Sequence, residues 1–148
     1  MSRASNGLQG VSIITSTNRP HFFYNILKNY NNQRYPVKEL IIILNKENVE
    51  LAKYQKIAQK YKNVSVYKIP EKESLGRCLN FAVSKTKYPF ITKFDDDDFY
   101  SPYYLSGQMK VLHQSNANIV GKRHILRISK QKSCSSFAFP NNKISSLV

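Results

Sequence analysis

Acidic residues are scarce and unevenly placed in this sequence of 148 residues. Nine acids stand against 23 Lys and Arg, and the consecutive run Asp95–Asp98 holds all the aspartate in the chain. The formal net charge of +14 favours polyanionic partners such as nucleic acid, anionic membranes or phosphorylated ligands, without choosing between them. A solvated, lysine-rich surface explains the same charge equally well.

Long apolar runs and cysteine patterns are also missing. The longest apolar run, Leu40–Leu44, is far too short to cross a bilayer, and residues 1–10 lack the hydrophobic stretch of a signal peptide. Cys78 and Cys134 match no metal or redox spacing, so we expect two ordinary buried thiols. Unpaired thiols fit a reducing compartment, and the sequence therefore predicts a cytoplasmic protein.

Several nucleotide and metal motifs are absent as well. There is no Gly-x-Gly-x-x-Gly turn and no Gly-Lys-Ser/Thr phosphate loop. The five glycines are too scattered for either motif: Gly7, Gly10, Gly76, Gly107 and Gly121. No Cys/His cluster indicates zinc. A phosphoacceptor receiver domain needs acids after its first strand, where this chain has Thr15–Thr17.

Short apolar runs alternate with segments of helical periodicity along most of the chain. Strands are predicted at residues 11–15, 40–44, 64–67, 89–94 and 118–128. Helices are predicted around residues 22–30, 51–61 and 75–83, and from a Ser101 N-cap with Pro102 at the first position to about Asn116. Such alternation predicts an α/β fold with a mostly parallel, Rossmann-like sheet flanked by helices.

The same pattern predicts the domain limits. Residues 1–10 form a polar tail, residues 11–128 form one domain, and residues 129–148 form a poorly ordered or partial tail. Ligands of parallel sheets bind beyond the carboxyl ends of the strands. The loop from Thr15 to Arg19 and the aspartate run follow the first and fourth predicted strands, so we expect both at one crevice.

Four adjacent carboxylates repel one another, and a divalent cation relieves that repulsion. Oxygen-only ligands suit Mg²⁺ or Mn²⁺, which share substrate phosphates with one or two protein carboxylates. In an extended chain residues i and i+2 point the same way, so Asp95 and Asp97 face the crevice while Asp96 and Asp98 point elsewhere or brace the turn. The alternative is a turn that merely favours a helix dipole, although Ser101 already supplies a cap.

Three segments resemble the inverting glycosyltransferases of family 2, which have the GT-A fold. Val11–Pro20 (VSIITSTNRP) resembles the opening strand and nucleotide loop of that family. Ser74–Ala82 (SLGRCLNFA) is similar to the helix before its metal strand, and Tyr88–Pro102 (YPFITKFDDDDFYSP) matches its Asp-x-Asp motif and following helix start. The resemblance runs from about Val11 to Arg123, and it implies a GT-A-like domain truncated after the Asp-x-Asp region.

The resemblance also implies roles for the aspartates and for the first loop. Thr15 and the loop through Asn18 and Arg19 would hold the nucleotide base and diphosphate. Asp97 would bind a metal bridging the two phosphates, and Asp95 or Asp96 would lie against the ribose or the metal. The expected metal is Mn²⁺ or Mg²⁺, and the expected donor is a UDP-sugar.

Two further positions follow from the resemblance. Arg77 would approach the base or the phosphates, or it is an ordinary surface arginine. Asn45 stands where the family often has an aspartate that contacts the base, so a neutral amide replaces a charge and the base preference is left open.

The sequence assigns no catalytic base. An inverting transferase deprotonates its acceptor hydroxyl, and the family supplies a carboxylate downstream of Asp-x-Asp. No Asp or Glu follows Asp98 here, and we expect His113 and His124 to be structural. Three hypotheses stay open: a glycosyltransferase, whose basic surface suits an anionic glycan or a membrane-associated acceptor; an inactive remnant that binds nucleotide and metal; and a nucleic-acid-binding module, favoured only by the charge.

Overall fold

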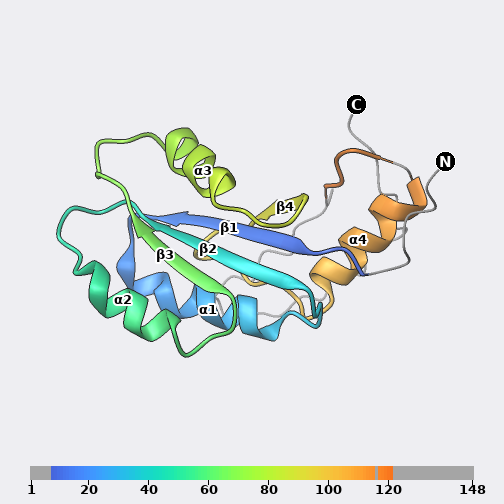
Figure 1. Cartoon of the computed structure of the whole chain (residues 1–148), viewed down its shortest axis with the longest axis horizontal. Helices are drawn as coiled ribbons and strands as arrows, with labels where there is room; N and C mark the ends of the chain where they lie inside the picture. Colours follow the sequence, from blue (N-terminus) through green and yellow to red (C-terminus); the bar gives the residue numbers. More distant parts are fainter. Residues whose placement is uncertain (1–7, 116, 122–148) are drawn as a thin grey trace, which may run out of the picture. The chain divides into compact units, whose positions relative to one another are not determined.

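The computed structural model describes residues 8–115 and 117–121. The chain divides into two compact units, residues 1–104 and residues 105–148. All strands and the first three α-helices of the described residues belong to the first unit (Figure 1). Helix α4, Tyr104–Ser115, begins at the boundary and belongs almost entirely to the second unit.

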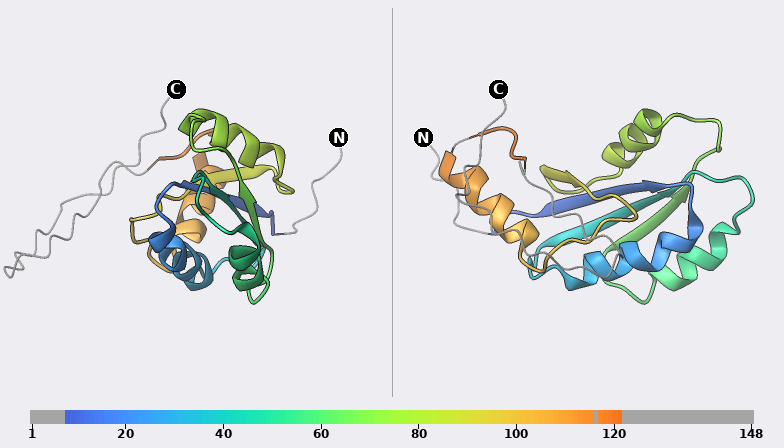
Figure 2. Two further views of the ribbon diagram at one scale, coloured as in Figure 1. Left: turned by 90° about the vertical axis from the view of Figure 1, so that its left-hand side faces the viewer. Right: turned by 180° about the vertical axis from the view of Figure 1, so that it is seen from behind.

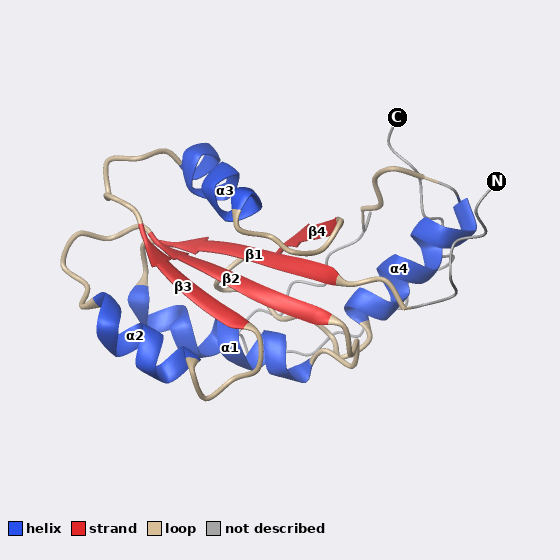
Figure 3. Cartoon of the chain, viewed as in Figure 1, coloured by secondary structure: helices blue, strands red, loops and turns tan. Residues whose placement is uncertain are grey.

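The first unit alternates strands and helices as the sequence pattern predicts (Figure 3). Its strands are β1 Val11–Thr17, β2 Lys38–Leu44, β3 Val64–Lys68 and β4 Phe90–Lys93. Its helices are the 3₁₀ turn η1 Pro20–Phe22, then α1 Phe23–Asn32, α2 Leu51–Ala58 and α3 Leu75–Ser84. The predicted α/β class is therefore confirmed.

The four strands form one sheet in the order β3-β2-β1-β4, and every pair is parallel. Helices α1 and α2 cover one face of the sheet and α3 covers the other (Figures 1 and 2). β1 and β2 are the two inner strands, and nearly all of their side chains are buried. Burial on both faces explains why residues 40–44 are continuously apolar.

Apolar packing fixes a helix on each face of the sheet. On the α3 face, Ile14, Ile41 and Ile43 pack with Cys78 and Ala82 in one buried cluster. On the other face, α1 places the buried side chains of Phe23, Ile26 and Leu27. The prediction of a buried thiol is confirmed for Cys78, while Cys134 lies outside the described residues.

Some predicted boundaries are wrong. β1 runs two residues further than predicted, because Ser16 and Thr17 continue the parallel pairing with β2. Ser101 and Pro102 form a turn before α4 instead of its first positions, and the Tyr104 amide donates to the Ser101 carbonyl at 3.0 Å.

The predicted last strand and the tails are only partly covered by the structure. Residues 118–121 contain no strand, and residues 122–128 lie outside the described part of the chain, as do residues 1–7 and 129–148. The predicted domain limits therefore stay predictions. None of the helices in the described ranges combines the length and hydropathy needed to span a bilayer.

A polar network joins the starts of the strands. The Ser12 hydroxyl donates to the buried Glu39 carboxylate at 2.6 Å, and the Lys87 amide donates to the same carboxylate at 2.6 Å. The Tyr88 amide donates to the Ser12 hydroxyl at 3.2 Å. The Tyr88 ring also lies against Gly10, where a Cβ atom would meet ring carbons at 2.1 and 2.4 Å. Only glycine fits at this position without displacing the ring.

We predict that Gly10→Ala lowers the free energy of unfolding by about 1–3 kcal/mol, because the added methyl group overpacks the Tyr88 ring. Chemical denaturation followed by circular dichroism measures this change. Gly107→Ala is the matched control: its Cβ meets no atom within 4 Å, and in helix α4 we expect a gain of about 0.5–1 kcal/mol. Equal effects of the two substitutions would contradict the packing argument.

Candidate functional site

The first loop and the aspartate run lie side by side because β1 pairs directly with β4. The Phe94 amide donates to the Ile14 carbonyl at 3.0 Å, which extends the pairing to the residue before Asp95. The carboxyl ends of both strands therefore open at the same edge of the sheet. The expectation that these two segments share one place on the fold agrees with this arrangement.

Asp96 is the structural centre of this edge. Its side chain is buried, with the residue only 6% exposed. The Thr17 hydroxyl donates to one carboxylate oxygen at 2.5 Å. The Arg19 guanidinium donates through Nε to the same oxygen at 3.2 Å and through Nη2 to the other oxygen. This bidentate pairing satisfies both oxygens and braces the loop against the aspartate run.

The neighbouring carboxylates point to solvent. Asp97 has a side chain that is 46% exposed and lies 3.1 Å from Arg19 Nη2. Asp95 has a side chain that is 49% exposed and pairs with Lys93. Burial, together with the charges of Asp95 and Asp97, raises the pKa of the Asp98 carboxyl. Asp96 is thus the one inward brace of the run, whereas Asp95, Asp97 and Asp98 are exposed. Asp98 departs from the expected i, i+2 alternation because the backbone bends at Asp96 and Asp97 and is not extended there.

Two asparagines of α1 hold the aspartate run by its backbone. The Asn25 side chain donates to the Asp96 carbonyl at 2.7 Å and to the Asp98 carbonyl at 3.1 Å. The Asn29 side chain donates to the Asp98 carbonyl at 2.7 Å and accepts from the Tyr100 amide at 3.0 Å. Sequence reasoning missed both residues, because they lie beside the apolar stripe of α1 among polar neighbours such as Lys28 and Asn32, where asparagines are ordinarily solvated.

The aromatic side chains after the run complete the support. The ring of Tyr100 stacks on Phe94 with a centroid distance of 3.7 Å, and Tyr104 meets both rings edge-on. The Asp95 amide donates to the Tyr100 hydroxyl at 2.9 Å. These contacts hold the segment after β4 against the end of the strand, so the backbone that carries the four carboxylates is fixed in position.

The other predicted binding residues have separate surroundings. Thr15 is completely buried within β1, and its hydroxyl has no hydrogen-bond partner among the described residues. Asn18 is exposed in the loop. The Asn45 amide side chain donates to the Pro70 carbonyl at 2.6 Å, which ties the end of β2 to the segment after β3. Arg77, in the first turn of α3, is 76% exposed at its side chain and pairs with Glu73.

The donor chemistry of this edge fits a hard divalent cation. Within the described ranges no three His, Cys, Asp or Glu side chains converge as a closed metal cage. The exposed carboxylates of Asp95 and Asp97 offer oxygen ligands only. Such a set suits Mg²⁺ or Mn²⁺ that completes its shell with water and ligand phosphates, and it does not suit zinc.

We predict that Thr17→Val destabilises the fold by about 1–3 kcal/mol, because the buried Asp96 carboxylate loses a donor that a methyl group does not replace. Thr17→Ser keeps the hydroxyl and serves as the control, with an expected loss below half of that value. Thermal unfolding of the three proteins measures the difference. Equal stability of Thr17→Val and Thr17→Ser would show that the contact contributes nothing.

Solved structures share this fold. S. aureus TarS (residues 1–349) superimposes with a TM-score of 0.65 at 16% identity, over 74% of this chain and 34% of that TarS fragment. The mannosyltransferase PcManGT from Pyrobaculum calidifontis, in complex with GDP-Man and Mn²⁺, gives a TM-score of 0.60 at 19% identity, over 72% of this chain and 33% of that protein. The parallel sheet with its flanking helices is therefore of the GT-A type.

Sequence comparisons agree with the fold. The O-antigen biosynthesis glycosyltransferase WbnJ of Escherichia coli is 32% identical over 145 residues, which are 95% of this chain and 57% of WbnJ. The chain thus spans little more than half the length of that relative. The family profile "Glycosyl transferase family 2" matches residues 12–134, which include all of β1 but Val11, the aspartate run and α4. This chain belongs to glycosyl transferase family 2.

Proposed function

We propose that this chain is the donor-binding part of a glycosyltransferase and holds a nucleoside-diphosphate sugar through a divalent cation. The observation that carries the proposal is the contact of Arg19 with Asp96 and Asp97, which joins the first loop to the Asp-x-Asp run. A basic side chain and exposed carboxylates then lie within one small area, where a pyrophosphate and its cation need both.

The four aspartates take different parts in this proposal. Asp97 is the principal metal ligand, and Asp95 assists it or lies against the ribose. Asp96 is buried and bonded to Thr17 and Arg19, and it would lose both partners if it turned outward. Contact of Asp96 with the ribose or the metal is therefore a weaker proposal than contact of Asp95. A bound Mg²⁺ or Mn²⁺ would neutralise the charge that develops on the leaving diphosphate.

Besides bonding to Asp96, Arg19 is proposed to contact the diphosphate of the donor. In the structure its Nη2 atom contacts both Asp96 and Asp97. A cation on Asp97 replaces only the second of these contacts, so Asp96 keeps the guanidinium beside the diphosphate. Asn18 adds a neutral donor from the same loop. Thr15 is fully enclosed in β1, so in this proposal it supports the loop and does not touch the donor. Asn45 and Arg77 are proposed to lie on the side of the site that receives the nucleotide base.

The donor is expected to be a UDP-sugar. TarS has been solved in complex with UDP-GlcNAc and PcManGT with GDP-Man and Mn²⁺, which supports a nucleotide-sugar ligand and a divalent cation for this fold. Asn45 stands at the position where the family often has an aspartate that contacts the nucleotide base. Because its side chain is a neutral amide, this position does not decide between uracil and guanine. The basic composition favours an anionic glycan or a membrane-associated acceptor, and we keep the cytoplasm as the proposed compartment.

Transfer itself needs a base that this sequence does not provide as a carboxylate after Asp98. His113 lies in the last turn of α4, and His124 lies outside the described residues. The proposal for these residues is therefore donor binding, and it assigns no catalytic base among them. The second candidate is a protein that binds nucleotide and metal without transfer, and the absence of Asp and Glu among residues 99–148 is the observation that favours it.

We predict that the chain binds UDP in the presence of Mn²⁺ and that Asp97→Ala weakens this binding at least about tenfold, because the cation loses its principal ligand. Isothermal titration calorimetry with and without EDTA measures both effects. Glu50→Ala is the matched control, because it removes an exposed acid after β2, outside the aspartate run.

The outcomes separate the hypotheses. Binding without sugar transfer or donor hydrolysis favours the second candidate. UDP binding that is equal in the wild type, Asp97→Ala and EDTA would refute the metal-dependent donor site. Salt-dependent binding of single-stranded nucleic acid that Asp97→Ala leaves unchanged would favour the nucleic-acid module instead.

A further inference from the structure

Acidic residues are concentrated at one end of the strands. Eight of the nine acids follow the carboxyl end of a strand: Glu47 and Glu50 after β2, Glu71 and Glu73 after β3, and Asp95–Asp98 after β4. The segments that lead into the strands carry lysine and arginine and no acid at all: Arg34 before β2, Lys60 and Lys62 before β3, and Lys85 and Lys87 before β4. The ninth acid, Glu39, lies at the start of β2 but is buried and bonded to Ser12 and Lys87. The exposed charges at the amino end of the sheet are thus basic, and this basic edge lies at the opposite end of the strands from the aspartates.

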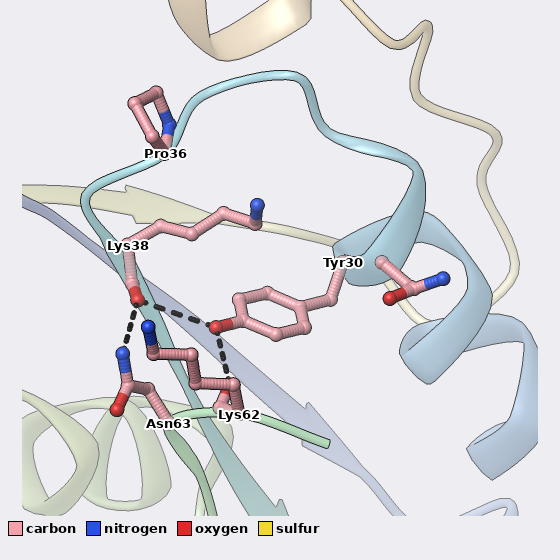
Figure 4. A pocket seen from close by; sticks show the side chains of 6 residues that line it. Tyr30, Pro36, Lys38, Lys62 and Asn63 are labelled. Atoms are coloured by element: carbon pink, nitrogen blue, oxygen red, sulfur yellow. Dashed lines mark hydrogen bonds between the residues drawn. The ribbon is translucent and has the colours of Figure 1, made fainter.

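A small hollow lies at this basic edge, where β2 and β3 begin (Figure 4). Its volume is about 100 Å³, which is the share of roughly three water molecules in the liquid. The residues that line it come from the end of α1 and from the segments before β2 and β3: Tyr30, Asn31, Pro36, Lys38, Lys62 and Asn63. The lining contains two lysines, two side-chain amides and no acid.

The Lys38 side chain is fixed beside this hollow by two hydrogen bonds to backbone carbonyls. Its ammonium donates to the Gln33 carbonyl at 2.9 Å and to the Tyr35 carbonyl at 2.9 Å, and it lies 5.3 Å from the centre of the Tyr30 ring. An ammonium group has three donors, so one remains for a ligand. Burial lowers the pKa of Lys38, and no carboxylate among the described residues lies within 4.0 Å of Lys38 or Lys62.

The floor of the hollow is fixed by hydrogen bonds. The Tyr30 hydroxyl shares its proton between the Lys62 carbonyl at 2.8 Å and the Lys38 carbonyl at 3.2 Å, and burial raises the pKa of Tyr30 to about 12. Asn63 has a left-handed backbone with φ of 57°, and its amide donates to the Lys38 carbonyl at 3.3 Å. Because an amide has two donors, Asn63 keeps one for a ligand.

A second hollow adjoins the first at Asn31. Its volume is about 490 Å³, and it is lined by aromatic, amide and basic side chains: Tyr24, Lys28, Asn31, Asn32, Gln33, Arg34 and Tyr61. Tyr24 is 63% exposed. Tyrosine faces with amide and guanidinium donors offer an apolar platform beside polar groups, which suits a sugar ring.

We propose that the Lys38–Lys62 hollow binds one phosphate or carboxylate group of an anionic sugar chain, whose sugar rings occupy the adjoining Tyr24–Tyr61 hollow. Lys38 and Lys62 supply the charge and the Asn31 and Asn63 amides supply neutral donors. Binding of a phosphate or carboxylate group in the Lys38–Lys62 hollow does not depend on the proposed donor site. The identification of the rest of the ligand as a sugar chain rests on the proposed function. The site would hold a substrate or product chain at the opposite end of the sheet from the aspartates.

The test uses the full chain and follows its amide resonances by NMR during titration with inorganic phosphate, a sugar monophosphate and the same uncharged sugar. We expect the Asn31 and Asn63 side-chain resonances to shift saturably with both phosphates, with the sugar monophosphate binding more tightly. Lys62→Ala should raise the Kd about tenfold, because a charge-assisted contact is lost. Lys62 is exposed, so this substitution is compatible with folding.

Lys53→Ala is the matched control, since it removes an exposed lysine of α2 that lines neither hollow, and its Kd should stay within about twofold of the wild type. Equal effects of Lys62→Ala and Lys53→Ala would overturn the oxyanion site. A sugar monophosphate that binds no better than inorganic phosphate, or single-stranded RNA that binds better than both, would overturn the sugar chain. Asp97→Ala should leave these titrations unchanged, which separates a failure here from a failure of the donor site.

Discussion

The buried carboxylate of Asp96 is the constraint on which the candidate site depends. A charge removed from water destabilises a fold unless hydrogen bonds and an opposite charge replace its hydration. Thr17 and Arg19 supply both, at 2.5 Å for the hydroxyl and through two nitrogens of the guanidinium. Because Thr17 ends β1 and Asp96 follows β4, the same three side chains also fix the relative position of two strand ends.

That arrangement explains how the chain accommodates four consecutive carboxylates. The Asp96 side chain turns inward and pairs with Arg19. The Asp95 and Asp97 side chains remain exposed and pair with Lys93 and Arg19, respectively. The backbone of the run is held from α1 by Asn25 and Asn29. The inward turn of Asp96 reduces the repulsion between its carboxylate and those of its neighbours. The repulsion that remains acts between the exposed carboxylates, where a divalent cation is able to relieve it.

Local patterns predicted the elements better than their ends. The apolar run Leu40–Leu44 indicated an inner parallel strand because burial on both faces favours apolar side chains at successive positions. The i, i+2 rule separated Asp96 from Asp95 and Asp97 but wrongly grouped Asp98 with it, since the backbone bends within the run. The extension of β1 to Thr17 depends on pairing with β2, which the polar residues themselves do not signal. Asn29 meets Tyr100 across 71 positions, a contact that only the folded chain defines. Ser101 appeared to be a helix cap, yet the turn it forms precedes α4.

The concentration of acids at one end of the strands also affects how fast ligands arrive. Within about a Debye length, roughly 10 Å at moderate salt, the net charge of +14 attracts an approaching anion and accelerates its diffusion toward the protein. Within the last few ångströms of the Asp95–Asp98 edge the field reverses and opposes a bare anion. Under the proposed function, a nucleotide that arrives with its cation bound would meet less of this repulsion than a bare nucleotide.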